Sequence, residues 1–181
     1  MKKILVHLTE GFEEVEAIAP VDVLRRAGYE VTMVSLTGNK YVTGSHGITI
    51  QSDVLFEQAD YSKADMILLP GGPGAKNLDN HEGLKAQIKQ FNHHGKPLAA
   101  ICAAPLVLAH LGILRGKNIT CFPGTEIHLE GSRITGQAVE VDGTIITAKG
   151  MGVAIKFALA IVEYFSGKEA ADALAKKMIA D

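Results

Sequence analysis

The sequence predicts an α/β fold in which a mostly parallel sheet is covered by helices on both faces. The first observation is that short apolar runs alternate along the chain with segments whose apolar residues recur at helical spacing. The second is the size of the chain, because 181 residues of which 47% are hydrophobic can bury a substantial core. No internal repeat or linker interrupts this pattern. We therefore expect a single domain over residues 1–181.

Strand signals occur throughout the chain. The clearest are the apolar runs at residues 3–8, 31–36, 66–70 and 98–102, and the polar stretch 37–53 between two of them is predicted to hold a hairpin. Further strands are predicted at residues 118–122, 133–136, 138–141 and 144–148. An Asp-Gly pair between the last two predicts a tight hairpin and hence some antiparallel pairing at one side of the sheet.

The first predicted helix, residues 13–27, contains a proline in its interior. Its apolar residues recur at helical spacing, and Gly28 is placed to cap its end. Because proline removes a backbone donor and clashes with the preceding turn, we expect Pro20 to kink or break the helix near residues 16–20. Other helices are predicted at residues 82–94, 104–112, 151–166 and 168–179.

Charge and cysteine content restrict the partners and the compartment. A net charge of -2 gives no basic face for nucleic acid or an anionic membrane, so small ligands fit better. The apolar run at the start is too short for a signal peptide, and no segment reaches the ~18 apolar residues of a membrane span. The two cysteines, Cys102 and Cys121, are far apart and suggest neither a disulfide nor a zinc site. We expect a cytoplasmic protein.

The carboxyl ends of three predicted strands carry unusual residues. In a doubly wound sheet, ligands bind outside these ends, where successive crossovers leave in opposite directions. Residues 9–16 follow the first strand, residues 70–74 follow the third major strand, and Cys102 with Ala103 ends the fourth. These segments could therefore meet at one point.

Cys102 stands at a predicted tight turn from a strand into a helix. There the free N–H groups and the helix dipole would stabilise a thiolate, which would be nucleophilic at neutral pH. The small neighbours Ala100, Ala103 and Ala104 leave space for a sharp turn. The alternative is an inert thiol in the core, since free cysteine is among the most buried residues. Cys121, inside a predicted strand, is expected to be such a core thiol.

Glu16 is the candidate acid or base beside Cys102. Helix dipole and solvation give an ordinary reason for Glu13 and Glu14 in a first helical turn. Glu16, however, stands between Val15 and Ala17 and could face inward. Two adjacent anions are unfavourable, so Cys102 and Glu16 would share one proton, with the pKa of the carboxyl raised.

The LPGGPG segment offers backbone donors. Adjacent glycines allow N–H groups to approach a ligand closely, and the N–H of Gly72 with that of Ala103 would form an anion hole. The alternative is a plain turn. The segment is neither GxGxxG nor a Walker loop, so nucleotide binding has little support. No metal site is expected, because the remaining histidines are not spaced relative to carboxylates as the ligands of a metal ion are. They are His7, His81, His93, His94, His110 and His128.

Four segments together resemble the DJ-1 family of the DJ-1/ThiJ/PfpI superfamily. They are EGFEEVEAIAPVDVLRRAG, LLPGGPGAKNL, AAICAAP and KGMGVAIKFALAIVEYFSGKEAADAL, in the family's order. The resemblance implies a flavodoxin-like three-layer sandwich, a homodimer and no cofactor. It also implies that Cys102 is the nucleophile, Glu16 its protonated partner, and Gly72 and Ala103 the backbone donors.

The chain departs from the family pattern at three positions. The histidine that many DJ-1 proteins hold near the cysteine is here Phe122, which cannot act as a base. PfpI-type peptidases have histidine directly after the cysteine, where this chain has Ala103, so protease activity is not expected. His46 falls where relatives can carry an arginine. His46 and Phe122 are candidate substrate contacts, and for His46 the alternative is a histidine of a surface loop.

Two functions follow from the resemblance. The first is an enzyme that acts on glyoxal or methylglyoxal without glutathione, or that removes their early adducts from proteins and nucleotides. The Cys102 thiolate would add to the aldehyde and Glu16 would move a proton. The second is a redox-responsive protective protein or chaperone, in which Cys102 is oxidised to a sulfinate.

Overall fold

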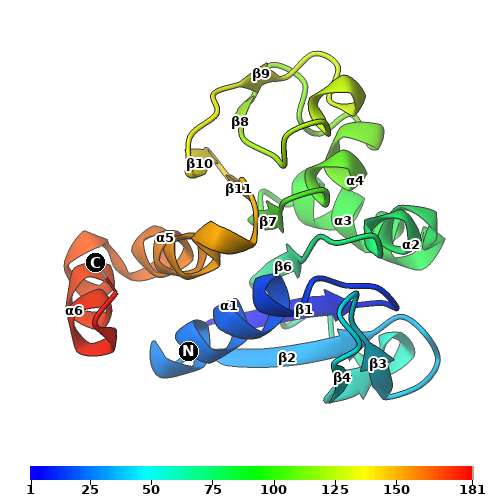
Figure 1. The fold of residues 1–181 in the computed structure, drawn as a ribbon, viewed down its shortest axis with the longest axis horizontal. Helices are drawn as coiled ribbons and strands as arrows, with labels where there is room; N and C mark the ends of the chain where they lie inside the picture. The colour runs from blue at the N-terminus through cyan, green and yellow to red at the C-terminus, as the bar shows by residue number, and fades with distance from the viewer. Residues whose placement is uncertain (181) are drawn as a thin grey trace.

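The computed structural model describes residues 1–180, and its centre is a seven-stranded sheet (Figure 1). The strand order is β10-β11-β7-β6-β1-β2-β5, and every neighbouring pair is parallel except β10 with β11. The predicted mostly parallel α/β fold is confirmed. The strands of this sheet are β1 (Lys3–Leu8), β2 (Glu30–Ser35), β5 (Val54–Leu55), β6 (Met66–Leu69), β7 (Leu98–Ile101), β10 (Val139–Asp142) and β11 (Ile145–Ala148).

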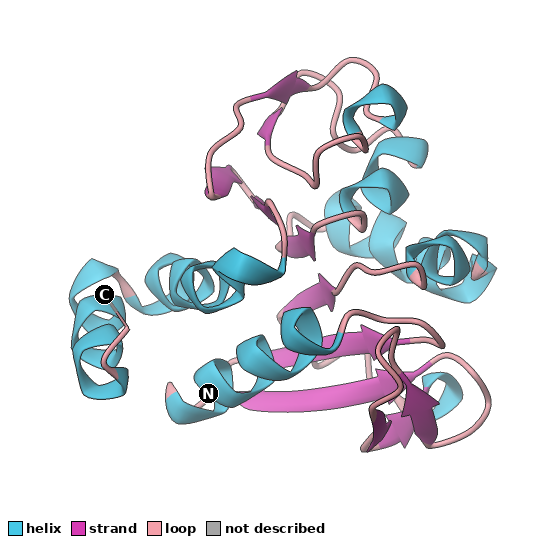
Figure 2. Cartoon of the chain, in the orientation of Figure 1, coloured by secondary structure: helices cyan, strands magenta, loops and turns pink. Residues whose placement is uncertain are grey.

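Helices cover both faces of the sheet (Figures 1 and 2). Because side chains alternate along a strand, Ile4 and Val6 of β1 join one core cluster and Leu5 joins the other. The first cluster is completed by α1 (Glu14–Arg26), α5 (Ala154–Ser166) and α6 (Lys168–Met178), and the second by α2 (Ala75–Asn80), α3 (Glu82–His93) and α4 (Pro105–His110). The helices therefore form two outer layers around the sheet.

The helix α1 continues through Pro20, so of the kink or break predicted near residues 16–20 the break is wrong. Pro20 is buried, together with Ala17, Val21 and Leu24 on the face that packs against the sheet. Burying a valine or leucine side chain stabilises by roughly 1.5–3 kcal/mol, which is comparable to the ~3 kcal/mol that an interior proline costs. Packing on the sheet thus offsets the missing backbone bond.

The connections show further agreements and differences. The hairpin predicted within residues 37–53 is confirmed as β3 (Tyr41–Thr43) paired with β4 (Thr49–Gln51). The strand predicted at residues 118–122 is shortened to β8 (Asn118–Ile119), which pairs with β9 (Arg133–Ile134) outside the main sheet. The short helix α2 is an addition to the prediction. Single 3-10 turns occur at Phe56–Gln58, Glu126–His128 and Met151–Val153.

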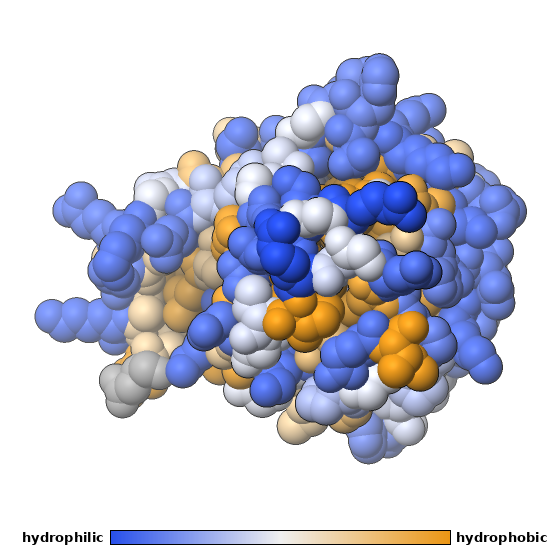
Figure 3. All heavy atoms as spheres, turned by 90° about the horizontal axis from the view of Figure 1, so that it is seen from above, coloured by the Kyte–Doolittle hydropathy of each residue, from blue (hydrophilic) through white to orange (hydrophobic). Residues whose placement is uncertain are grey.

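The surface in Figure 3 is mainly hydrophilic, and its apolar side chains gather in a few patches near the middle of the view. Within residues 1–180, none of the helices has both the length and the apolar character required to cross a bilayer.

Candidate active site

The three strand ends singled out in the sequence meet at one edge of the sheet. The strand β1 lies between β6 and β2, and its crossover leads to β2 whereas the crossover from β6 leads to β7. The point where the crossovers diverge is where ligands bind in such sheets. The loops that follow β1 and β6 are in direct contact, because the N–H of Gly74 donates to the carbonyl of Gly11 at 2.8 Å.

Cys102 occupies a strained backbone position directly after β7. Its φ of 65° lies in the left-handed region. Among the non-glycine residues of 1–180, only Ile179 shares this conformation. For a non-glycine residue this conformation costs roughly 1–2 kcal/mol. Two hydrogen bonds hold it in place: the N–H of Cys102 donates to the carbonyl of Ala148 at 2.9 Å, and the N–H of Phe122 donates to the carbonyl of Cys102 at 2.9 Å. The predicted sharp turn is therefore present, and the residue keeps 9% of its surface exposed.

Glu16 faces inward from the first turn of α1, as predicted. It is 1% exposed, and its Oε2 accepts a hydrogen bond from the N–H of Gly71 at 2.9 Å. A Cβ on Gly71 would lie 2.7 Å from both that oxygen and the Cβ of Cys102. Only a glycine therefore allows the acid and the cysteine to approach from the two sides of this loop.

Burial and mutual contact set the ionisation of this pair. Desolvation raises the pKa of Glu16 to about 7, against the hydrogen bonds from Cys102 and Gly71 that favour the carboxylate. Desolvation and the negative charge of Glu16 also raise the pKa of Cys102, to about 12. The raised pKa of the carboxyl was predicted. The backbone N–H groups predicted to stabilise a thiolate are present at Gly72 and Ala103, but desolvation and the charge of Glu16 outweigh them. A thiolate therefore forms readily only when Glu16 holds the shared proton.

The two predicted backbone donors face the sulfur. Hydrogen bonds from the N–H groups of Gly72 and Ala103 lower the pKa of Cys102 and partly offset its burial. Gly72 has a φ of 87°, and a Cβ there would lie 2.6 Å from the nitrogen of Glu13. Glycine is thus required at residue 72 both for the conformation and for the close approach of the two loops.

Glu13 and Glu14 are buried, so the interpretation as solvated first-turn acids is wrong. Glu13 is the N-cap of α1 and accepts a hydrogen bond from the N–H of Glu16 at 2.8 Å. Glu14 binds the tip of the β3–β4 hairpin: its Oε1 accepts from the N–H of His46 at 2.7 Å, and its Oε2 contacts His46 Nδ1 at 2.9 Å. These bonds lower the pKa of Glu14 to about 2, although desolvation opposes them.

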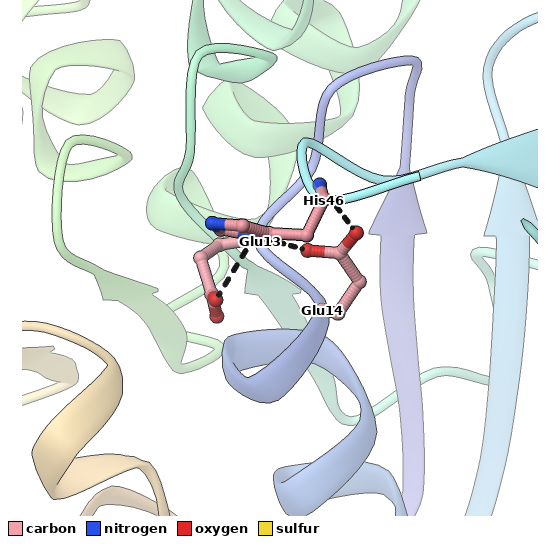
Figure 4. A group of neighbouring side chains, drawn as sticks. All are labelled: Glu13, Glu14 and His46. Atoms are coloured by element: carbon pink, nitrogen blue, oxygen red, sulfur yellow. Dashed lines mark hydrogen bonds and ion pairs between the residues drawn. The ribbon is translucent and has the colours of Figure 1, made fainter. Parts of the chain in front are cut away.

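His46 packs beside both of these acids. Figure 4 shows Nδ1 of His46 facing both carboxylates, with Glu13 Oε1 at 4.0 Å. The hydrogen bond to Glu14 and its charge raise the pKa of His46, whose side chain is 70% exposed. The three groups are close enough to hold a metal ion, but the hydrogen bonds within the protein already account for their arrangement. The role of His46 in substrate contact remains a prediction.

The remaining sequence candidates lie near Cys102 or in the core. Phe122 is bonded to Cys102 through its backbone, and a Cβ on Gly150 would lie 3.4 Å from its ring. Cys121 is buried, as expected. Sequence reasoning missed two backbone groups beside Glu16, the N–H of Gly71 and that of Met151. The glycine pair after β6 was a signal for the first, whereas nothing local to Met151 indicates the second.

Comparisons with known proteins identify the family of the chain. The model of the DJ-1/PfpI family matches residues 2–164. The dj-1beta protein of Drosophila melanogaster is 39% identical over 98% of this chain and 97% of its own length. A Pyrococcus abyssi protein named a deglycase is 31% identical over 83% of this chain and 91% of its own. The structure of oxidised Toxoplasma gondii DJ-1 superposes with a TM-score of 0.95 at 33% identity, covering 99% of this chain and 98% of that one. The chain therefore belongs to the DJ-1/PfpI family.

Proposed function

We propose that the protein is a cysteine-dependent enzyme that converts small 2-oxoaldehydes such as methylglyoxal, or their early adducts with amines, into 2-hydroxy acids. The observation that carries the proposal is the contact between Cys102 and Glu16, two groups with raised pKa values that can exchange one proton beneath two N–H donors. The relative of Pyrococcus abyssi that is named a deglycase supports the same class of reaction.

The residues of the site have one role each in this proposal. The Cys102 thiolate forms a C–S bond with the aldehyde carbon, and the electron pair of the carbonyl moves to oxygen, which the N–H groups of Gly72 and Ala103 stabilise. Glu16 protonates this oxygen, removes the proton from the former aldehyde carbon and delivers a proton to the neighbouring carbon, while the hydroxyl proton passes to the oxygen of that neighbouring carbon. The resulting thioester is hydrolysed by water, which releases the 2-hydroxy acid and restores the thiol.

An early adduct would follow the same route once its amine has left and the aldehyde carbonyl is restored. Such an adduct is the aldehyde with an amine added across its carbonyl group, so one water again yields the 2-hydroxy acid together with the free amine. The overall reaction needs no oxidant, because the aldehyde carbon is oxidised while its neighbour is reduced.

The test is conversion of methylglyoxal to lactate by the reduced full-length protein. Cys102→Ala and Glu16→Gln are each expected to lower the rate at least about 100-fold, the size of effect typical of a lost nucleophile or acid–base group. Cys121→Ala is the matched control, since that thiol is buried in the other core cluster, and it should retain the wild-type rate. Lactate formation that survives in Cys102→Ala would refute the proposed chemistry.

A redox role of the same cysteine is the second candidate. It is favoured by the similarity to an oxidised DJ-1 of Toxoplasma gondii and by a buried carboxyl in contact with the sulfur. Two peroxide molecules would each transfer one oxygen to Cys102 and leave as water, and neutral Glu16 would donate a hydrogen bond to the sulfinate. A protein that forms no lactate but gains two oxygens at Cys102, and none at Cys121, would favour this function over the first.

We also propose that two copies of the chain associate through α1 and α5. Val15 and Ile18 of α1 and Ile155 of α5 are large apolar residues exposed on neighbouring helices. Val15 and Ile155 line a groove of about 270 Å³ together with Ala19 and Leu159. An apolar surface of this kind fits a second copy of itself across a two-fold axis. Light scattering should give twice the 19.3 kDa mass of one chain, and a single-chain mass would exclude the dimer.

A further inference from the structure

An open apolar hollow lies beside the Cys102–Glu16 pair. It has a volume of about 250 Å³. Its lining residues are Phe122, Pro123, Lys149, Gly150, Met151, Gly152 and Val153. Apart from Lys149, which is exposed to solvent, these residues offer only apolar side chains and backbone. The hollow therefore suits an uncharged group.

The wall of the hollow is in contact with both members of the pair. On one side, the backbone of Phe122 is bonded to Cys102, since its N–H donates to the cysteine carbonyl at 2.9 Å. On the other, Gly150 separates the Phe122 ring from Glu16: a Cβ on Gly150 would lie 3.4 Å from the ring and 4.0 Å from Glu16 Oε1. The hollow thus borders the backbone of Cys102 and the carboxyl of Glu16.

Two large apolar side chains of the wall are half exposed. Phe122 is 51% exposed; Met151 is 53% exposed in the single chain, and it also lines the groove proposed above as the contact with a second copy. Such side chains next to a reactive group are the usual lining of a binding site for an apolar substituent, because contact with it would remove their surface from water.

The proposed reaction fixes the direction in which the substituent of the substrate points. The aldehyde carbon is bonded to Cys102, and its neighbour must lie next to Glu16 to receive the proton. The substituent is carried by this second carbon. It therefore leaves the site on the side of Glu16, where Gly150 and Phe122 lie.

We propose that this hollow binds the apolar substituent of a 2-oxoaldehyde held on Cys102, with Phe122 and Met151 as the specificity-determining residues, so that aryl-substituted 2-oxoaldehydes are preferred to methylglyoxal. This inference rests on the proposed function and names its substrate class.

The first test compares two substrates of the wild-type enzyme and its variants. The value of kcat/KM for phenylglyoxal, measured as mandelate, should exceed that for methylglyoxal, measured as lactate, by about tenfold, the scale of effect that a hydrophobic pocket provides. Phe122→Ala and Met151→Ala should each reduce this preference severalfold, mainly through a higher KM for phenylglyoxal. Ile127→Ala is the matched control, because Ile127 is a highly exposed apolar residue of the same loop outside the hollow.

The second test does not depend on turnover. Phenacyl bromide and bromoacetone each alkylate Cys102 by displacing bromide, and intact mass spectrometry of a Cys121→Ser background measures both rates. Relative to the same two reagents on N-acetylcysteine, the protein should favour phenacyl bromide by about tenfold. Phe122→Ala should abolish that selectivity, whereas Ile127→Ala should keep it.

The outcomes separate the two proposals. Selective alkylation without any 2-hydroxy acid would support the hollow and refute the proposed function. Turnover of both substrates at equal kcat/KM, or a preference that is unchanged in both Phe122→Ala and Met151→Ala, would overturn the inference and leave the enzyme activity standing. Equal alkylation by the two reagents would also overturn it.

Discussion

The chemistry of the site depends on two residues that share one proton. Cys102 and Glu16 are 86 positions apart in the sequence, and they meet across Gly71, where any side chain would collide with both. The turn at Cys102 and the inward direction of Glu16 could be predicted from their neighbours. The raised pKa of the thiol could not, because it depends on how deeply the finished fold buries the sulfur.

The raised pKa of Glu16 predicts a pH dependence of stability. The folded pKa of about 7 lies above the ordinary value of 4.5, so the folded state binds more protons between these values. The contribution of Glu16 to the free energy of unfolding therefore falls as the pH rises through this window, by about 3 kcal/mol in total. Glu16→Gln lacks this loss, so its stability relative to the wild type should rise between about pH 5 and about pH 8.

Denaturant unfolding of both proteins at the two pH values provides the measurement. Glu169→Gln is the control, since Glu169 is an exposed first-turn acid of α6, and its stability relative to the wild type should be nearly constant. A Glu16→Gln variant with an equally constant difference would show that the carboxyl is ionised in the folded protein at the lower pH.

At the scale of elements, the start of α1 organises the mouth of the site. The sequence predicts both α1 and the β3–β4 hairpin, but it does not predict that the hairpin tip docks on α1 through Glu14. Glu14 and His46 are 32 positions apart, so no local pattern reports their contact. The prediction of a break at Pro20 failed for a similar reason, because the packing of α1 on the sheet cannot be read from the proline itself.

The docking predicts a local effect of one substitution. Glu14→Ala removes the acceptor for the N–H groups of His46 and Ile48, so their amides should exchange hydrogen at least about tenfold faster. The hairpin should also lose about 1–3 kcal/mol of local stability. Hydrogen exchange of the His46 and Ile48 amides, measured by NMR, gives both the rates and the local stability of the hairpin. Glu169→Ala is the control. Unchanged protection at both amides would mean that the hairpin is held by other contacts.

At the scale of the whole molecule, the order of strands explains why the site lies where it does. The alternation of apolar runs and helical patterns was sufficient to predict the parallel sheet and both helical layers. The contacts between segments far apart in the sequence could not be predicted from this alternation. The strand β8 pairs with β9 outside the main sheet, and the backbone N–H of Met151 bonds to Glu16, 135 positions earlier in the sequence. These contacts depend on how the complete sheet twists and closes around the site.

The most direct test of the account is the ultraviolet absorbance of the Cys102 thiolate as a function of pH, taken as the difference between the wild type and Cys102→Ala. If burial and the charge of Glu16 keep the shared proton on the sulfur, thiolate should stay at its baseline as the carboxyl ionises near pH 7 and appear only well above the ordinary thiol pKa. Glu16→Gln lacks this negative charge, so its thiolate should appear at a lower pH than that of the wild type. A single step of full amplitude near the ordinary thiol pKa of ~8.5, identical in Glu16→Gln, would contradict the shared proton.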